Sequence, residues 1–214
     1  MKKIEIHKQS FFLHPSGGVF WEATQTWLLA DVHLGKVAHF RKNGIAVPRE
    51  AEGAFYQKIG SLLHLKPPKR ILFLGDLFHS FQNNEWHLFE AWTQKQEAQL
   101  VLVEGNHDVI PSLKFKQLGM KVVEQLCEGP FCFSHFPSEK TTHFVFCGHV
   151  HPGIKLKGTA KQTLKLPCFL HSTHQFILPA FGGFTGLHLV KPTSLDQIYI
   201  TTGKEVIEIP VNKS

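Results

Sequence analysis

The chain has 214 residues, 43% of them hydrophobic and 19% charged, which is enough apolar material to bury the core of one domain spanning residues 1–214. Lysine and arginine outnumber aspartate and glutamate by 23 to 17, and the resulting net charge of +6 favours an anionic partner without identifying it. No run of about 18 apolar residues occurs and charges interrupt the N-terminal segment, so we expect a cytoplasmic protein without a signal peptide or a membrane-spanning helix.

The cysteines are scattered through apolar, strand-like runs without a Cys-x-x-Cys pair; they are Cys127, Cys132, Cys147 and Cys168. This spacing favours small buried side chains over a disulfide framework or a thiolate zinc site, so we expect all four to be reduced. Histidine is more informative, because the chain has 15 of them and histidines at strand ends point to metal chemistry.

Five short apolar runs rich in Val, Ile, Leu and Phe each end abruptly in polar residues. They are TWLLADVH (26–33), RILFLGDLFH (70–79), QLVLVEGNHD (99–108), FCFSHFP (131–137) and HFVFCGHVHPG (143–153). Continuous apolar runs of this length are typical of strands that are buried on both faces. We therefore predict a strand in each run, with the polar residues just beyond its carboxyl end.

Three segments with helical character lie along the chain after the first, second and third predicted strands. The apolar residues of 48–65 share one helical face after a proline and an acidic start, and 83–96 and 109–119 are two further predicted helices. Strands that alternate with helices predict an α/β core. Residues 153–190 alternate like strands between glycine turns, so we expect them to form a second, mostly antiparallel layer.

The polar residues beyond the strands should converge, because open α/β sheets bind ligands at the carboxyl ends of their strands. The candidates are Asp31, His33, Asp76, His79, Asn106, His107, His135, His149 and His151. Carboxylate, amide and imidazole ligands together suit manganese, iron or zinc, whereas calcium and magnesium prefer oxygen alone. The set is large enough for two metals that share a bridging carboxylate, and such a pair suits phosphoester hydrolysis.

Taken singly, these motifs allow simpler interpretations. GNHD is compatible with an ordinary turn, and His149 and His151 are compatible with solvated histidines of a loop. Their order along the chain and their shared place at strand ends favour the metal site.

The ordered motifs DVH, GDLFH, GNHD, the single His135 and GHVH resemble those of the calcineurin-like metallophosphoesterases. The resemblance implies a four-layer αββα sandwich around a dinuclear site, with manganese as the expected metal. It implies that one metal is held by Asp31, His33, Asp76 and His151, and the other by Asp76, Asn106, His135 and His149. Asp76 would bridge the two metals.

Longer phrases are more specific, such as GDLFHSFQNNEW (75–86), GHVHPGIKL (148–156) and LPAFGGFTG (178–186). Over nearly the whole chain they resemble the bacterial ligase-associated DNA-damage-response phosphoesterases, the PdeM family. This resemblance implies a metal-dependent DNA endonuclease in DNA repair that works with an ATP-dependent DNA ligase and a helicase.

The histidine of GDLFH also has an implied role. Many relatives carry an aspartate that pairs with the catalytic histidine at the position of His79, whereas GDLFH resembles a nuclease branch in which a histidine stands there. The resemblance implies that His79 lies beside His107 and orients it, while His107 stabilises the transition state or protonates the leaving oxygen. The alternative is that His79 makes only a supporting hydrogen bond.

Basic residues follow two of the ligand motifs and form a candidate rim for a nucleic-acid backbone: Lys36, Arg41, Lys42, Lys155 and Lys157. A solvated lysine-rich hairpin is the simpler alternative. Phe40, Trp86 and Phe136 are aromatic candidates for base stacking, although most of the 19 phenylalanines should lie in the core.

Two other functions compete with a DNA nuclease. The same metals could cleave a small nucleotide, such as a cyclic nucleotide or a nucleotide pyrophosphate, since a chain of this length has little room for a cap domain. A scaffold of a repair complex is the non-enzymatic alternative. His107 argues against a scaffold, because scaffolding relatives typically lose this histidine.

Overall fold

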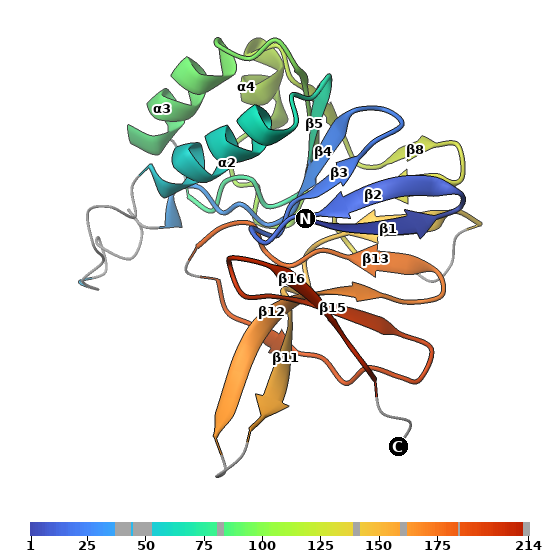
Figure 1. The fold of residues 1–214 in the computed structure, drawn as a ribbon. Coiled ribbons are helices and arrows are strands. Elements are labelled where there is room, and N and C mark those ends of the chain that lie inside the picture. The colour runs from blue at the N-terminus through green and yellow to red at the C-terminus, as the bar shows by residue number, and fades with distance from the viewer. Residues whose placement is uncertain are drawn as a thin grey trace.

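Two β-sheets pack face to face in the computed structural model of the chain, and helices cover the outer face of the first sheet (Figure 1). The structure describes residues 1–36, 44, 53–80, 84–138, 142–158, 162–183 and 185–211.

The first sheet follows the order of the chain. Its strands are β1 (Lys2–Ile6), β2 (Gln9–Leu13), β3 (Val19–Trp21), β4 (Thr26–Leu29), β5 (Arg70–Leu74), β6 (Gln99–Val103) and β7 (Lys121–Val123). Neighbours from β1 to β4 are antiparallel, whereas neighbours from β4 to β7 are parallel. Parallel neighbours need crossover connections, and these crossovers contain the helices.

The helices are α2 (Ala54–Leu65), α3 (Asn84–Thr93) and α4 (Ser112–Gln117), which confirms a helix within each predicted segment. Alternation along β5 shows how the layers form, because Ile71 and Phe73 pack under the helices while Leu72 and Leu74 face the second sheet. A strand that is buried on both faces therefore appears in the sequence as a continuous run of apolar residues.

The second sheet is mixed. Its strands are β8 (Leu126–Glu128), β9 (Phe131–Phe133), β10 (Phe144–Cys147), β11 (Pro152–Lys157), β12 (Thr163–His171), β13 (Gln175–Ile177), β14 (His188–Leu189), β15 (Gln197–Thr201) and β16 (Val206–Ile209). The later strands pair mostly antiparallel, as predicted, but β10 is parallel to β9 and β13, and β11 is parallel to β14.

Phenylalanine fills the space between the sheets. Phe11 of the first sheet contacts Phe131 and Phe146 of the second, with ring centroids 5.3 Å and 4.8 Å apart, and Phe133 and Phe176 extend the cluster. All five side chains are fully buried. Rings of this size in tilted and edge-on contact hold the two sheets in register, so the carboxyl ends of strands from both sheets meet at one edge of the sandwich.

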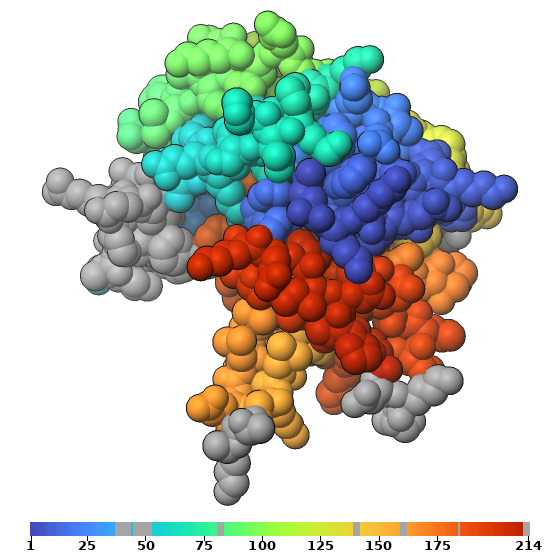
Figure 2. All heavy atoms as spheres, viewed as in Figure 1, coloured from blue at the N-terminus to red at the C-terminus, as the bar shows by residue number. Residues whose placement is uncertain are grey.

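The expected αββα class is confirmed in its two central sheets, and of its two outer helical layers the described residues supply the one on the first sheet. All helices of the described residues lie on the first sheet, and on the outer face of the second sheet these residues form small apolar clusters around Cys132, Cys147 and Cys168. The β11–β12 hairpin projects from the body of the molecule, which Figure 2 shows as a separate arm.

The expectation of four reduced cysteines is wrong for one pair. Cys127 and Cys132 stand directly opposite each other where β8 pairs with β9, and a disulfide joins them. The tight antiparallel turn brings their Cα atoms to 4.1 Å, a proximity that scattered sequence positions do not reveal. Cys147 and Cys168 are free and buried, as expected. No helix of the described residues is long and apolar enough to cross a membrane.

Candidate metal centre

The five predicted strand ends converge at one edge of the sandwich, where β4, β5 and β6 of the first sheet meet β9 and β10 of the second. Five of the residues there have left-handed backbone conformations, with φ between 50° and 65°: Asp31, His33, Asp76, His149 and His151. Non-glycine residues rarely adopt this conformation, and it is concentrated where a site requires particular side-chain directions. Sharp turns at the strand ends therefore aim these side chains at one another.

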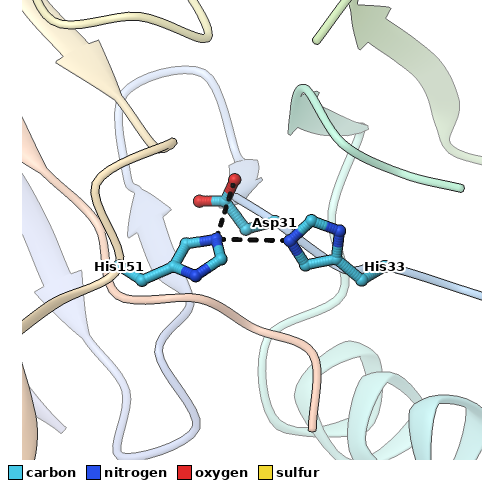
Figure 3. A group of neighbouring side chains, drawn as sticks. All are labelled: Asp31, His33 and His151. Atoms are coloured by element: carbon cyan, nitrogen blue, oxygen red, sulfur yellow. Dashed lines mark hydrogen bonds and ion pairs between the residues drawn. The ribbon is translucent and has the colours of Figure 1, made fainter. Parts of the chain in front are cut away.

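One group of side chains comprises Asp31, His33 and His151 (Figure 3). Nε2 of His151 lies 3.2 Å from Nε2 of His33 and 3.4 Å from Oδ1 of Asp31. The first two residues follow β4, whereas His151 follows β10, so the group joins the two sheets.

A second group surrounds His135, which follows β9. Its Nε2 lies 2.9 Å from Oδ1 of Asn106, 3.2 Å from Nδ1 of His149 and 3.4 Å from Oδ1 of Asp76. Nδ1 of the same ring lies 3.0 Å from the carbonyl oxygen of Leu74, which fixes the ring's orientation. Four candidate ligand atoms thus point at one location.

Asp76 stands between the two groups. Its Oδ1 faces His135 at 3.4 Å, while its Oδ2 lies 3.9 Å from Nε2 of His33. The side chain is almost fully buried and its Oδ1 also accepts the backbone N–H of His107 at 2.9 Å. One carboxylate therefore presents an oxygen to each group, which is the position of a bridging ligand.

Two buried polar atoms of the site have no hydrogen-bond partner among the described residues, as is common in an ion-binding site. Oδ1 of Asp31 and Nδ1 of His33 are buried and accept or donate no hydrogen bond within the described ranges. Burial, together with Lys36 and the neighbouring histidines, lowers the pKa of His33 to about 2, and burial also lowers the pKa of His149. These imidazoles are neutral at physiological pH and can offer lone pairs, so the donor set fits divalent cations.

Asp108 holds the loops of the site together, a role that the sequence did not reveal. Its Oδ2 accepts the backbone N–H groups of Asp76 and Gly105, and its Oδ1 accepts those of Leu77 and Phe78, at distances from 2.8 to 3.1 Å. Burial raises its pKa to about 6 despite these hydrogen bonds. The feature of the sequence that could have identified Asp108 is its position in the GNHD motif, directly after His107.

Glycine is required where the loops touch the ligands. A Cβ atom at Gly105 would overlap Oδ1 and the backbone nitrogen of Asp76, and one at Gly75 would overlap the imidazole of His135. Gly75 also has a φ of 80°, in the region that favours glycine. The glycines of GDLFH and GNHD therefore permit close approach of Asp76 and His135, two of the candidate ligands.

His79 and His107 lie at the rim of this centre. Their ring centroids are 5.1 Å apart with a tilt of 47°, and His79 is also 5.4 Å from the ring of His33. His107 is exposed, whereas His79 is half-buried and its backbone N–H donates to the carbonyl oxygen of Leu34 at 2.8 Å. The exposed ring is thus accessible to a substrate, and the partly buried ring lies beside it.

The basic residues predicted to bind a nucleic-acid backbone do not all lie in one place. Lys36 is half-buried near Asp31 and Asp76, and burial lowers its pKa. Lys155 and Lys157 are exposed on the projecting β11–β12 hairpin, which begins directly after His151. Arg41 and Lys42 lie outside the described residues.

The aromatic candidates for base stacking differ in their exposure to solvent. Trp86 is 2% exposed and belongs to the core under the helices, whereas Phe136 is 48% exposed beside His135 and His149. Phe40 lies outside the described residues.

A cavity of about 180 Å³ adjoins His33 on the side of Lys36. Its walls include Phe55, Tyr56, Lys58, Glu85 and Phe181. Nζ of Lys58 donates to the carbonyl oxygen of Phe181 at 2.5 Å and lies 4.1 Å from the centre of that ring.

Known proteins are similar to this chain in fold and in sequence. The crystal structure of the nuclease MPE from Pseudomonas putida is similar over 97% of this chain and 99% of that chain, with 28% identity and a TM-score of 0.79. The phosphoesterase Yfce from E. coli has 12% identity over 87% of this chain and 99% of its own, with a TM-score of 0.41. No curated protein sequence matches the chain. The family model of the calcineurin-like phosphoesterases matches residues 24–171, which include every candidate ligand, and the chain therefore belongs to this family of hydrolases.

Proposed function

We propose that this phosphoesterase hydrolyses phosphodiester bonds of DNA and acts as an endonuclease in DNA repair. The observation that carries the proposal is the position of Asp76, which presents one carboxylate oxygen to each of two ligand groups. The similarity to a nuclease over 97% of the chain supports DNA as the substrate.

The assignment of ligands follows the two groups. Asp31, His33, Asp76 and His151 would hold one cation, and Asp76, Asn106, His135 and His149 the other. Manganese is the favoured ion, with iron or zinc as alternatives, since all three suit mixed oxygen and nitrogen donors. Two such cations, when bound, would lower the pKa of a coordinated water and neutralise phosphate oxygens.

His107 supplies the proton for the leaving group in this proposal. The oxygen of water bonds to phosphorus as the water loses one proton to the solvent, the bond from phosphorus to the ester oxygen breaks, and the departing oxygen takes a proton from His107, which the solvent then returns. The ring is exposed at the rim of the centre, and the backbone N–H of His107 donates to Oδ1 of Asp76 at 2.9 Å, which links its loop to a candidate ligand.

His79 is a positioning residue for that ring. It lies 5.1 Å from His107 between centroids, and its backbone is paired to Leu34. A half-buried imidazole in this place restricts the rotamers of its exposed neighbour.

The basic rim would bind the backbone of the DNA strand through Lys36, Arg41, Lys42, Lys155 and Lys157. By the resemblance of its sequence, the protein would act as a single cytoplasmic domain together with an ATP-dependent DNA ligase and a helicase.

A small nucleotide phosphoester is the second candidate substrate. The cavity of about 180 Å³ beside His33 favours it, because its walls combine the lysines Lys36 and Lys58 with aromatic rings.

The test is cleavage of circular single-stranded DNA and of bis-p-nitrophenyl phosphate in parallel, with manganese, magnesium or a chelator. His107→Ala should lose both activities, while His87→Ala, a change at an exposed histidine of α3, should keep both. Cleavage of the small ester alone would favour the second candidate. Absence of metal-dependent cleavage of either compound would overturn the proposal.

A further inference from the structure

We propose that Phe136 is a stacking platform for an unpaired nucleobase next to the scissile phosphate. The inference rests on the proposed function and adds the kind of DNA that the site would prefer. A base can stack on a flat ring beside the metal centre only if it has left the duplex, so the site would prefer single-stranded DNA.

The position of Phe136 beside the ligands is the first argument. Its ring centroid lies 4.7 Å from the ring of His135 and 4.6 Å from the ring of His149, in edge-on contact with both. A phosphate held at this centre would therefore bring its own base, or the next one, within reach of the ring.

The exposure of Phe136 is the second argument. It is 48% exposed, whereas eleven phenylalanines are among the largest fully buried side chains. Within the described ranges, every other phenylalanine, tryptophan and tyrosine is buried or half-buried. Phe136 is thus the one exposed phenylalanine, tryptophan or tyrosine ring of the described residues, and it lies where a substrate would bind.

The surroundings of the ring fit a base better than a phosphate. An open cavity of about 530 Å³ lies beside it, lined by Glu104, Glu124, Gln125 and Ser134. Carboxylate and amide oxygens accept hydrogen bonds from the amino and imino groups of a base edge, and carboxylates repel phosphate. Lys36, in contrast, lies at the His33 end of the centre. The charges therefore place the base over Phe136 and the backbone towards the lysine.

The platform is held in place before any substrate arrives. The hydroxyl of Ser134 donates to the carbonyl oxygen of Phe136 at 2.6 Å, and the neighbouring His135 is fixed through Leu74 at 3.0 Å. A ring on an ordered backbone, in edge-on contact with His135 and His149, loses less conformational freedom when a base stacks on it than a ring on a mobile loop would lose.

The experiment is a double-mutant cycle between the ring and the base. Single-stranded oligonucleotides with one cleavage site are prepared intact or with an abasic residue at each position around that site. Phe136→Ala should lower kcat/KM for the intact strand by about 5- to 150-fold, the range expected for one base on one aromatic ring. One abasic position should lower kcat/KM of the wild type similarly, and at that position the variant and the wild type should be equal.

Two further variants separate stacking from support of the ligands. Phe136→Trp should keep the activity on the intact strand, and Phe136→Leu, which keeps apolar contact with the histidines, should lose it. Manganese affinity, measured by titration, should stay unchanged in all three variants.

Additive losses at every abasic position would overturn the platform, as would a loss of manganese affinity that accounts for the lost activity. Failure of the wild type to cleave any oligonucleotide would overturn the proposed function and the platform together, whereas normal cleavage with an additive cycle would overturn the platform alone.

Discussion

The carboxylate of Asp108 accepts the backbone N–H of Asp76 at 3.0 Å, and the same oxygen accepts that of Gly105 at 2.8 Å. A residue outside the predicted ligand set thereby connects the loop after β5 to the loop after β6. The bridging position of Asp76 depends on this connection, because the hydrogen bonds fix the backbone from which its carboxylate projects.

Asp108→Asn should weaken the centre. An amide has one acceptor oxygen, so its NH2 group would face two backbone N–H groups that Asp108 now satisfies. We expect manganese affinity to fall about 10- to 100-fold, as is usual when a residue that orients metal ligands is lost. Calorimetric titration measures this, with Asp196→Asn as the control, a change at a half-buried aspartate that accepts the backbone N–H of Thr193. Equal affinities in the two variants would contradict the prediction.

Gly105→Ala should disrupt the site for a steric reason. The added methyl would overlap the Asp76 carboxylate, so metal binding and turnover should both be lost. The matched control is Gly60→Ala in α2, where a Cβ meets no described atom within 4 Å. That variant should keep its activity and gain about 0.4 to 1 kcal/mol in free energy of unfolding. Metal-dependent activity and urea denaturation of both variants provide the comparison.

His79→Ala should reduce turnover while metal stays bound. The ring of His107 would lose the neighbour at 5.1 Å that restricts it, and we expect kcat to fall about 10-fold or more. Metal content is measured alongside kcat, and His64→Ala at the exposed end of α2 is the control. Unchanged turnover would show that His79 has no part in positioning His107.

Lys155→Ala and Lys157→Ala should weaken DNA binding in a salt-dependent way. Each exposed lysine that contacts a phosphate releases a counterion, so the slope of log affinity against log salt should become shallower by about 0.7 per residue on a single strand. Fluorescence anisotropy at several salt concentrations measures the slope. Lys204→Ala, at an exposed turn, should leave it unaltered, and a slope unchanged in the hairpin variants would exclude contact with the backbone.

Lys58 should make stability depend on pH. Burial lowers its pKa to about 8 in the folded protein, compared with about 10.4 for a lysine in an unfolded chain. Between these values the unfolded state binds more protons, so the contribution of Lys58 to stability is full above pH 10.4 and is lost as pH falls through about 8.

The free energy of unfolding of the wild type, minus that of Lys58→Met, should therefore rise between pH 7 and pH 10. Urea denaturation of metal-free protein at constant ionic strength measures this difference, and Lys204→Met controls for the loss of one positive charge. A difference that does not vary with pH would contradict the assignment.

The sequence predicted the strands and the polar residues that follow them, because each strand's pattern of apolar residues also fixes where the strand ends. Each apolar run before Asp31, Asp76, Asn106, His135 and His149 is a strand, because side chains buried on both faces leave no polar residue until the strand ends. The proximity of His79 to His107 followed from a resemblance, since nothing local connects residues on different loops.

Other features depend on contacts between distant segments. The role of Asp108 requires four backbone donors from two loops, and the Cys127–Cys132 bond requires the exact register of β8 and β9. The sequence alone did not distinguish Trp86 from Phe136 as candidates for base stacking. Tertiary packing buries Trp86 and exposes Phe136. Composition and periodicity carry no information of this kind.

The phenylalanine cluster between the sheets has a consequence for the choice of cation. Asp31 and His33 come from the first sheet and His151 from the second, so the thickness of the aromatic layer sets the span across which these ligands face one another. Ions differ in the bond lengths they accept by a few tenths of an ångström. If these residues hold a cation as proposed, rings such as Phe146 would help to set the distance between its ligands, and shortening one of these rings would alter metal selectivity as well as stability.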